Sequence, residues 1–361
     1  MNTARQLLAA LAALPLSKPV RVLNLCGDQE RVISLSGMRR ALPDNVRLLS
    51  GPGCAASVCP EPDLYQVIQL AMLHPVTVLA AENMLQLPLG RRAPGPRCLR
   101  EAALEGADVR TVSAPVEAVL AARAEPQREM VFFAAGFETL LAPLAGMVLE
   151  GLPENLSILL CGRRVEFLLE RLLAQADPGF DALLLPGNRC AITGTGAWDD
   201  LVHRHHVPAA VAGYDSTSVL AAVHAVVRQH CAGEARVENY YRAMVRPEGN
   251  AMALDQLYRV FDIVDGDWRG VGRVRQTAFR LRHAYGVVNA DCRYPDYRGD
   301  LRAADNEMPA GCECAAVVLG QKDPMDCRQF CVGCTVGIPY GPCMASEDGA
   351  CFVRSADRRA A

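Results

Sequence analysis

The chain has 361 residues, of which 51% are hydrophobic, and a formal net charge of −3. This length predicts two or three domains with well-formed cores. The near balance of charge argues against nucleic acid as the main partner, because a phosphate-binding surface usually carries a basic excess. No apolar run reaches the ~18 residues that cross a bilayer, so a membrane partner is not expected either.

The first segment, residues 1–19, predicts a short helix rather than a signal peptide. Only Arg5 precedes the apolar stretch Leu7–Leu16, and a proline interrupts that stretch. We expect this helix to pack on the C-terminal domain, and we expect the protein to be cytoplasmic.

Short apolar runs alternate with amphipathic helical stretches over the first two-thirds of the chain. Continuous apolar strands separated by helices are typical of parallel α/β layers. We therefore predict an α/β fold in which two Rossmann-like parallel domains, residues 20–128 and 129–234, flank a cleft. The predicted strands are Val20–Leu25, Val46–Leu49, Val76–Ala80, Met130–Ala134, Leu156–Leu160, Ala182–Leu185 and Ala209–Val211. The predicted helices are Asp63–Met72, Arg163–Ala174 and Ser216–His230.

The character of the chain changes in residues 235–361, which we predict to be a third domain. A helical pattern around Val237–Val260 is followed by loop-rich sequence with many Gly, Pro and Asp residues. Such a stretch cannot bury a large core by itself, and bound metal is an economical source of order for it.

Seven of the fifteen cysteines fall between Cys312 and Cys351, and this clustering favours metal ligation. A [4Fe–4S] cluster takes thiolates from loops with mixed spacings, as here. Structural zinc is the competing interpretation, but only Cys331–Cys334 has the spacing of a zinc knuckle, and no histidine follows His283. Unligated or disulfide-bonded cysteines are the third possibility, although disulfides are typical of small secreted proteins.

Several motifs, taken together and in order, resemble one known family. They are Leu48–Cys54, Phe133–Thr139, Val237–Tyr241, Glu248–Ala251, Trp268–Gly272, Pro324–Cys327 and Gly341–Cys351. From about Val22 to Cys351 the chain is similar to the HypD family of [NiFe]-hydrogenase maturation factors, as a divergent member. The resemblance implies a loop-rich C-terminal iron–sulfur domain.

The resemblance also implies a set of cluster ligands. The expected ligands are Cys312, Cys327, Cys334 and Cys351, whose spacings fit the family pattern. Cys314 is the alternative first ligand or a redox thiol close to the cluster. Cys331 is expected to be an extra cysteine, and Cys343 is not required as a ligand.

Cys26 follows the first predicted strand, where α/β proteins place ligands. By its residues alone it is most simply a small buried hydrophobe. The resemblance implies instead that Cys26 binds iron within a Cys-Gly-x-His motif. This chain has Gln29 at the histidine position. An amide cannot shuttle a proton near neutral pH, so this is a departure from the family.

A second departure concerns a Cys-x-x-Cys pair of the family. The chain keeps Cys54 but has Ser57 at the second position, and Cys59 follows two residues later. Serine forms no disulfide and is a poor ligand for soft iron. Cys59 is either a replacement thiol, if the loop is remodelled, or a buried side chain without a role.

Other cleft motifs differ in the same way. The segment Leu185–Cys190 resembles the family's Pro-Gly-His-Val-Ser, with Asn188 in place of histidine and Cys190 in place of serine. Glu138 is retained, and Asp215 stands where the family has glutamate. Two acids facing one cleft could hold a base or a metal-bound water. The cluster His203, His205 and His206 matches no family motif and is interpreted as an exposed patch at a helix end.

The resemblance implies a scaffold that assembles the Fe(CN)2CO group of [NiFe]-hydrogenase. The partners would be a small HypC-type chaperone and a HypE-type cyanide donor, with transient iron held at Cys26. The catalytic thiols would be Cys54 and Cys59. The alternatives are a cluster-dependent thiol/disulfide redox enzyme, and a paralogue that binds the chaperone without carrying iron.

Overall fold

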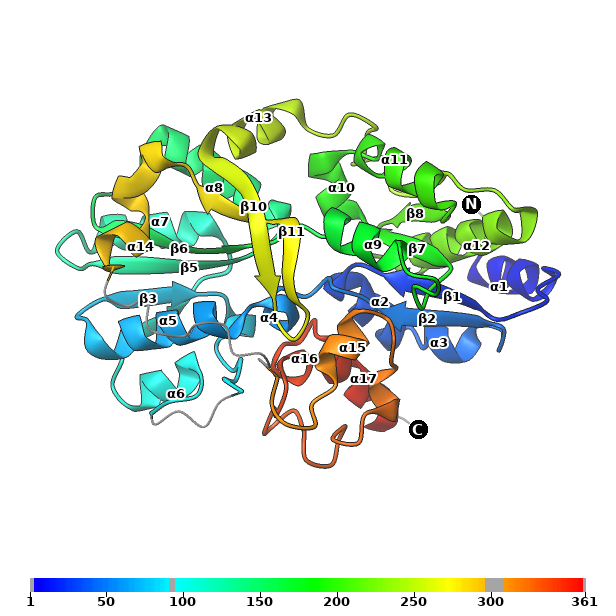
Figure 1. The fold of residues 1–361 in the computed structure, drawn as a ribbon, viewed down its shortest axis with the longest axis horizontal. Helices are drawn as coiled ribbons and strands as arrows, with labels where there is room; N and C mark the ends of the chain where they lie inside the picture. The colour runs from blue at the N-terminus through cyan, green and yellow to red at the C-terminus, as the bar shows by residue number, and fades with distance from the viewer. Residues whose placement is uncertain (1–2, 91–94, 296–307, 360–361) are drawn as a thin grey trace.

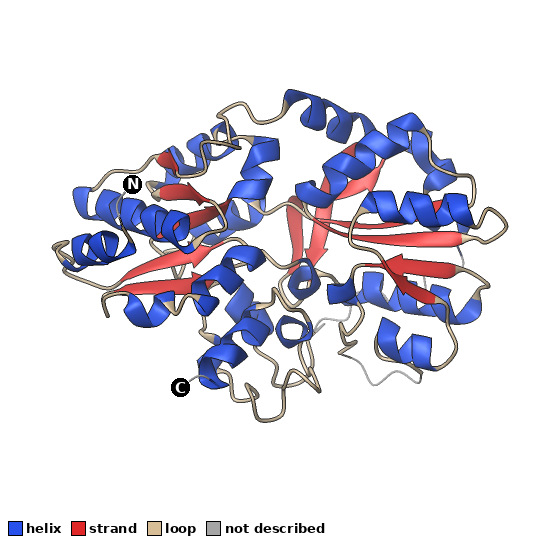
Figure 2. Ribbon diagram, turned by 180° about the vertical axis from the view of Figure 1, so that it is seen from behind, coloured by secondary structure: helices blue, strands red, loops and turns tan. Residues whose placement is uncertain are grey.

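Two parallel β-sheets form two lobes, and a cysteine-rich segment lies between them in the computed structural model (Figures 1 and 2). The structure describes residues 3–90, 95–295 and 308–359. The α/β fold class is therefore confirmed. Within the described residues, no helix is both long enough and apolar enough to cross a membrane.

The sheet of the first lobe has the strand order β2-β1-β7-β8-β9, and all neighbours are parallel. Every residue of β7 and β8 is buried, as expected for strands covered on both faces. The strands are β1 (Val20–Asn24), β2 (Val46–Ser50), β7 (Ala182–Pro186), β8 (Ala209–Ala212) and β9 (Val237–Asn239). Its helices are α1 (Ala4–Ala12), α2 (Gly27–Leu35), α3 (Met38–Ala41), α9 (Glu166–Leu173), α10 (Gly187–Thr193), α11 (Gly196–His205) and α12 (Ser216–Ala232).

The sheet of the second lobe has the order β4-β3-β5-β6 and is also fully parallel. The strands are β3 (Thr77–Ala80), β4 (Val109–Thr111), β5 (Met130–Gly136) and β6 (Leu156–Gly162). The helical segments around it are α5 (Glu61–Leu73), η1 (Glu82–Met84), α6 (Leu99–Leu104), α7 (Pro115–Ala124), α8 (Glu138–Glu150), α13 (Ala251–Val260), η2 (His283–Val288) and α14 (Ala290–Arg293).

The strand pairing differs from the expected division into residues 20–128 and 129–234. Strand β3 pairs directly with β5, so the boundary after residue 128 would cut the second sheet. Strand β1 pairs with β7, so the chain leaves the sheet of the first lobe after β2 and returns to that sheet at β7. The N-terminal helix also differs from expectation. Helix α1 packs on α12 of the first lobe, where Leu7 and Leu11 join its core, and not on the C-terminal segment.

All seven predicted strands and all three predicted helices are confirmed within a few residues at their ends. The expected helix over Val237–Val260 is wrong in its first part, because residues 237–239 form edge strand β9 and only α13 is helical. The loop expected after it is instead an antiparallel hairpin of β10 (Phe261–Trp268) and β11 (Gly272–Leu281).

The hairpin reaches from the second lobe to the C-terminal residues 308–359, which we call the cysteine segment (Figure 1). This segment contains α15 (Cys314–Val318), η4 (Pro324–Asp326), α16 (Pro342–Ala345) and α17 (Ala350–Arg359). Its cysteines share a core with Leu25 of the first lobe and with Trp268 of the hairpin. The short helix α4 (Ala55–Val58) contacts α15, α16 and β5, so it joins the cysteine segment to the second lobe.

Candidate metal centre and cleft

Three cysteine side chains converge inside the cysteine segment. The sulfurs of Cys314, Cys343 and Cys351 all lie within 4.8 Å of one another, and all three residues are buried. Cys314 begins α15, Cys343 is in α16 and Cys351 is in the first turn of α17. Three short helices therefore deliver one thiol each to a common point, which we call the sulfur triad.

A fourth thiol lies against the triad. The interaction between Cys312 and Cys314 lowers the pKa of Cys312 and raises the pKa of Cys314, since only one of two touching sulfurs readily carries a negative charge. The backbone at Gly341 passes close to both, because a Cβ added there would lie 2.3 Å from the Cys312 sulfur and 2.9 Å from the Cys314 sulfur. Only glycine fits beside this pair without displacing it.

The triad overlaps only in part with the expected ligands. Cys351 belongs to both sets, Cys312 contacts the triad, and Cys314 was the expected alternative. Cys327 and Cys334 lie outside the 4.8 Å group, and the Cys334 sulfur accepts the N–H of Tyr340 at 3.3 Å. Cys343, expected to be dispensable, is in the triad. The sequence feature that could have identified Cys343 is its position in the motif Gly341–Cys351, in the part of the chain where cysteines are most concentrated.

The donor chemistry of the segment suits iron and sulfur. Every candidate ligand there is a thiol, and soft thiolates select iron–sulfur clusters and other soft metal centres. The triad is buried among apolar side chains, where thiolates without a cation would be costly. The residues present therefore fit an iron–sulfur cluster.

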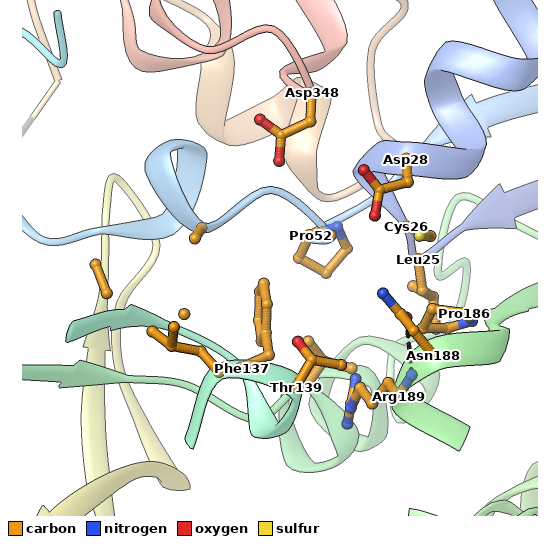
Figure 3. A pocket seen from close by; sticks show the side chains of 16 residues that line it. Leu25, Cys26, Asp28, Pro52, Phe137, Thr139, Pro186, Asn188, Arg189 and Asp348 are labelled. Carbon is orange, nitrogen blue, oxygen red and sulfur yellow. Dashed lines mark hydrogen bonds between the residues drawn. The ribbon is translucent and has the colours of Figure 1, made fainter. Parts of the chain in front are cut away.

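Cys26 lies beside a pocket of about 180 Å³ where the three parts of the molecule meet (Figure 3). Leu25 and Cys26 come from the first lobe, Phe137 from the second lobe and Asp348 from the cysteine segment. Because Cys26 follows β1 and begins α2, it lies at the carboxyl edge of the sheet, where α/β folds bind ligands.

The environment of Cys26 is apolar on one side and acidic on the other. Burial raises the pKa of Cys26 to about 12, so the free thiol is neutral at pH 7. Asp28 and Asp348 direct their carboxylates toward the pocket (Figure 3), and burial and then the charge of Asp348 raise the pKa of Asp28. The Tyr214 hydroxyl accepts the N–H of Asn188 at 2.8 Å and lies beside the Cys26 sulfur.

Gln29 does not face the pocket. It is fully buried, and its side-chain nitrogen donates to the carbonyls of Ala212 at 2.8 Å and Leu185 at 3.2 Å. The amide therefore ties α2 to the ends of β7 and β8. Asn188 does line the pocket, and its side-chain oxygen accepts the N–H of Arg189 at 2.7 Å.

Cys54 lies between the pocket region and the sulfur triad. Its sulfur is 3.4 Å from the Ser346 hydroxyl of the cysteine segment and accepts the N–H of Ser57 at 3.4 Å. The Ser57 hydroxyl lies beside both Cys54 and Cys343 of the triad. Thus Ser57 occupies the space between a cleft thiol and a triad thiol.

Cys59 points to a different place. Its sulfur is 3.7 Å from the sulfur of Cys161, within the core of the second lobe. Cys161, near the end of β6, was missed by the sequence analysis, because a lone cysteine within an apolar strand carries no local signal.

The two predicted acids are in unlike surroundings. Glu138 begins α8, is buried and pairs with buried Arg189 at 2.8 Å. Burial raises the pKa of Glu138 to about 7, although Arg189 acts against this. Arg189 also pairs with Glu166. Asp215 is exposed and accepts the N–H of Ser218 at 2.9 Å, which caps α12, so it does not line the pocket.

The histidines at the end of α11 have the expected setting. His203 and His206 are exposed, and His205 is partly buried. They form no metal-ligating group in the described parts of the chain.

Fold and site together define a two-lobed α/β protein that holds a buried group of thiols beside a cysteine-containing pocket. A family model named HypD and described as the hydrogenase formation hypA family matches residues 2–356. This chain belongs to the HypD family of hydrogenase maturation factors.

Curated relatives match over most of their length. The chain is 35% identical to hydrogenase maturation factor HypD1 of Bradyrhizobium diazoefficiens, over 92% of this chain and 87% of the relative. It is 34% identical to hydrogenase maturation factor HypD of Azotobacter vinelandii, over 97% of this chain and 92% of the relative. It is 32% identical to the HypD of Cupriavidus necator, over 91% and 87%.

Proposed function

We propose that this protein is a scaffold on which the Fe(CN)2CO group of [NiFe]-hydrogenase is assembled, with a [4Fe–4S] cluster in the cysteine segment. The observation that carries the proposal is the sulfur triad, which is separated from Cys54 by Ser57, in a chain of the HypD family. When bound, the cluster supplies electrons to the cleft.

The ligand set divides into two proposals that can be tested against each other. The family pattern implies Cys312, Cys327, Cys334 and Cys351. The proximity of the sulfurs favours the triad together with Cys312. The proposals differ at four cysteines, and one from each set, Cys343 and Cys327, is sufficient to decide between them.

Cys26 is the proposed ligand for the cargo iron. Burial keeps its thiol protonated, so an iron cation would replace the proton and stabilise the thiolate. The carboxylates of Asp28 and Asp348 make the pocket attractive to a cation, while Phe137 and Pro52 limit the entry of water. Glu138, with a pKa of about 7, holds or releases a proton near neutrality.

The partners proposed from the family are a HypC-type chaperone, which would share the iron with Cys26, and a HypE-type cyanide donor. We also infer a cytoplasmic location, because the proposed thiol ligands persist in a reducing compartment.

One observation favours a second candidate, a paralogue that binds the chaperone without carrying iron. The amide nitrogen of Gln29 is committed to backbone carbonyls and leaves no proton carrier at that position. A cluster-dependent thiol/disulfide redox enzyme remains the third candidate.

One anaerobic experiment separates these functions. The chain is purified with a HypC-like protein, iron is counted by Mössbauer spectroscopy, and bound CO and CN⁻ are sought by infrared spectroscopy. Infrared bands of bound CO and CN⁻ together with isolated iron support the scaffold function. Loss of the bands and of the isolated iron in Cys26→Ala confirms that Cys26 is the iron ligand. A complex without bands supports the iron-free paralogue. The absence of both the complex and the infrared bands would refute the scaffold function and the iron-free paralogue.

The ligand set is tested by single substitutions. Cys343→Ser should lower cluster iron if the triad holds the cluster, whereas Cys327→Ser should lower it if the family pattern holds. Cys231→Ser, at the end of α12 in the first lobe, is the matched control and should retain the iron. Iron-free protein that is folded in all variants would refute the cluster itself.

A further inference from the structure

We propose that Cys59 and Cys161 form a two-electron dithiol/disulfide couple in the core of the second lobe. Their sulfurs are 3.7 Å apart, and their side chains are 0% and 2% exposed. A disulfide needs these sulfurs at about 2.05 Å. The two thiols are therefore already in contact, and a movement of roughly 1.7 Å closes the bond.

The position of each thiol in the fold assigns it a different task. The Cys161 S–H is directed at the sulfur of Cys59, and the Cys59 S–H is directed at the carbonyl of Pro60 at 3.6 Å. Cys59 also lies at the end of the four-residue helix α4, whereas Cys161 is held within β6. A four-residue helix opens more readily than a strand that is paired with β5 along its whole length, so Cys59 is the thiol that reaches an incoming reagent.

Two charged groups, Arg163 and Asp63, lie close to the pair. The contact with Cys59 and burial hold the pKa of Cys161 well above its ordinary value, and the nearby buried guanidinium of Arg163 acts against this increase. The carboxylate of Asp63 pairs with Arg163 at 3.2 Å and adds to the increase. The pair thus has a nucleophile, a second thiol and a nearby cation.

The oxidant is a low-molecular-weight disulfide, RSSR. The Cys59 thiolate attacks one sulfur of RSSR, which forms a mixed disulfide and releases one RS⁻. The Cys161 sulfur then attacks the Cys59 sulfur of the mixed disulfide and displaces the second RS⁻. The two cysteine protons end on two RSH molecules, so the pair loses two electrons and RSSR gains them.

The couple lies at the end of helix α4, so its redox state affects how that helix is held. Helix α4 contacts α15 and α16 and begins at Cys54, whose sulfur touches Ser346. A bond from Cys59 to Cys161 would tie the end of this helix to the second lobe. The couple therefore sets how tightly the Cys54 loop is held. The inference needs neither the cluster nor the cargo iron, so it stands apart from the proposed function.

The test is peptide mapping of the full chain after equilibration in glutathione buffers of graded potential, with acid quenching and alkylation. Trypsin leaves Cys161 as the one cysteine of residues 129–163, and it leaves Cys54 and Cys59 together on residues 48–91. The expected product is a cross-link between these peptides that dithiothreitol reverses. In the wild-type protein, the fragment ions of the cross-linked peptides show whether the link is at Cys59 or at Cys54.

Variants provide the matched comparison. The cross-link should persist in Cys54→Ser and be lost in Cys59→Ser and Cys161→Ser. Cys190→Ser removes another fully buried thiol, in the core of the first lobe, and should leave the cross-link unchanged. A link from Cys161 to Cys54, or two thiols that stay free while other cysteines oxidise, would overturn the proposal. The wild-type fragment ions decide the outcome even if a variant fails to fold.

Discussion

Gly341 packs tightly against two thiols of the candidate metal centre, and Gly341→Ala tests this packing. The added Cβ would lie 2.3 Å from the Cys312 sulfur and 2.9 Å from the Cys314 sulfur. The backbone there is extended, with φ of −120°, so alanine brings no backbone strain and the whole effect is steric. Both sulfurs must shift to accept the methyl group, and the shift of Cys314 disturbs the triad to which it belongs.

Forcing an extra methyl group into a packed site typically costs about 1–3 kcal/mol. We therefore expect Gly341→Ala to lower the unfolding free energy of the metal-free protein by about that amount, and to lower cluster iron after reconstitution. Anaerobic urea titration gives the first quantity, and iron and sulfide assays give the second.

Gly337→Ala is the control, because a Cβ at that position meets no atom within 4 Å. This change should stay within about 0.5 kcal/mol of wild type. If the two alanine variants unfold at the same urea concentration and hold the same iron, the packing of Cys312 against Cys314 described above would be refuted.

Three further substitutions test the buried groups. The pKa of Glu138 is raised to about 7, so its contribution to stability is lost as pH rises from about 4.5 to 7. Relative to wild type, Glu138→Gln should therefore gain on the order of 2–3 kcal/mol between pH 5 and pH 8. Exposed Glu150→Gln, at the end of the same helix, should show no such trend in urea titrations. Gln29→Leu should cost about 1–3 kcal/mol, because Ala212 and a second carbonyl lose their donor; an unchanged unfolding midpoint would contradict this role. Leu11→Ala should cost about 2–5 kcal/mol if α1 packs on α12, and thermal unfolding of the variant measures it.

The local structure of the α/β region follows from its sequence. Runs such as Met130–Ala134 and Ala182–Leu185 are apolar throughout, which is sufficient to predict strands buried on both faces. The sequence also indicates where thiols converge, because only the last fifty residues concentrate cysteines beyond chance, and the sulfur triad lies there. Elements without a strong apolar pattern, such as β9 with its partly buried residues, were not predicted.

Which segments meet was decided by the tertiary structure. Apolar periodicity reports that a strand is buried but not which strand lies beside it, so the pairing of β1 with β7 could not be seen in the sequence. The same holds for the thiols. Cys343 joins Cys314 and Cys351 because three short helices begin close to one point, and Cys59 meets Cys161 across about a hundred residues of chain. Residue types and spacing determine what chemistry a chain can perform, whereas contacts between distant segments determine which side chains perform it.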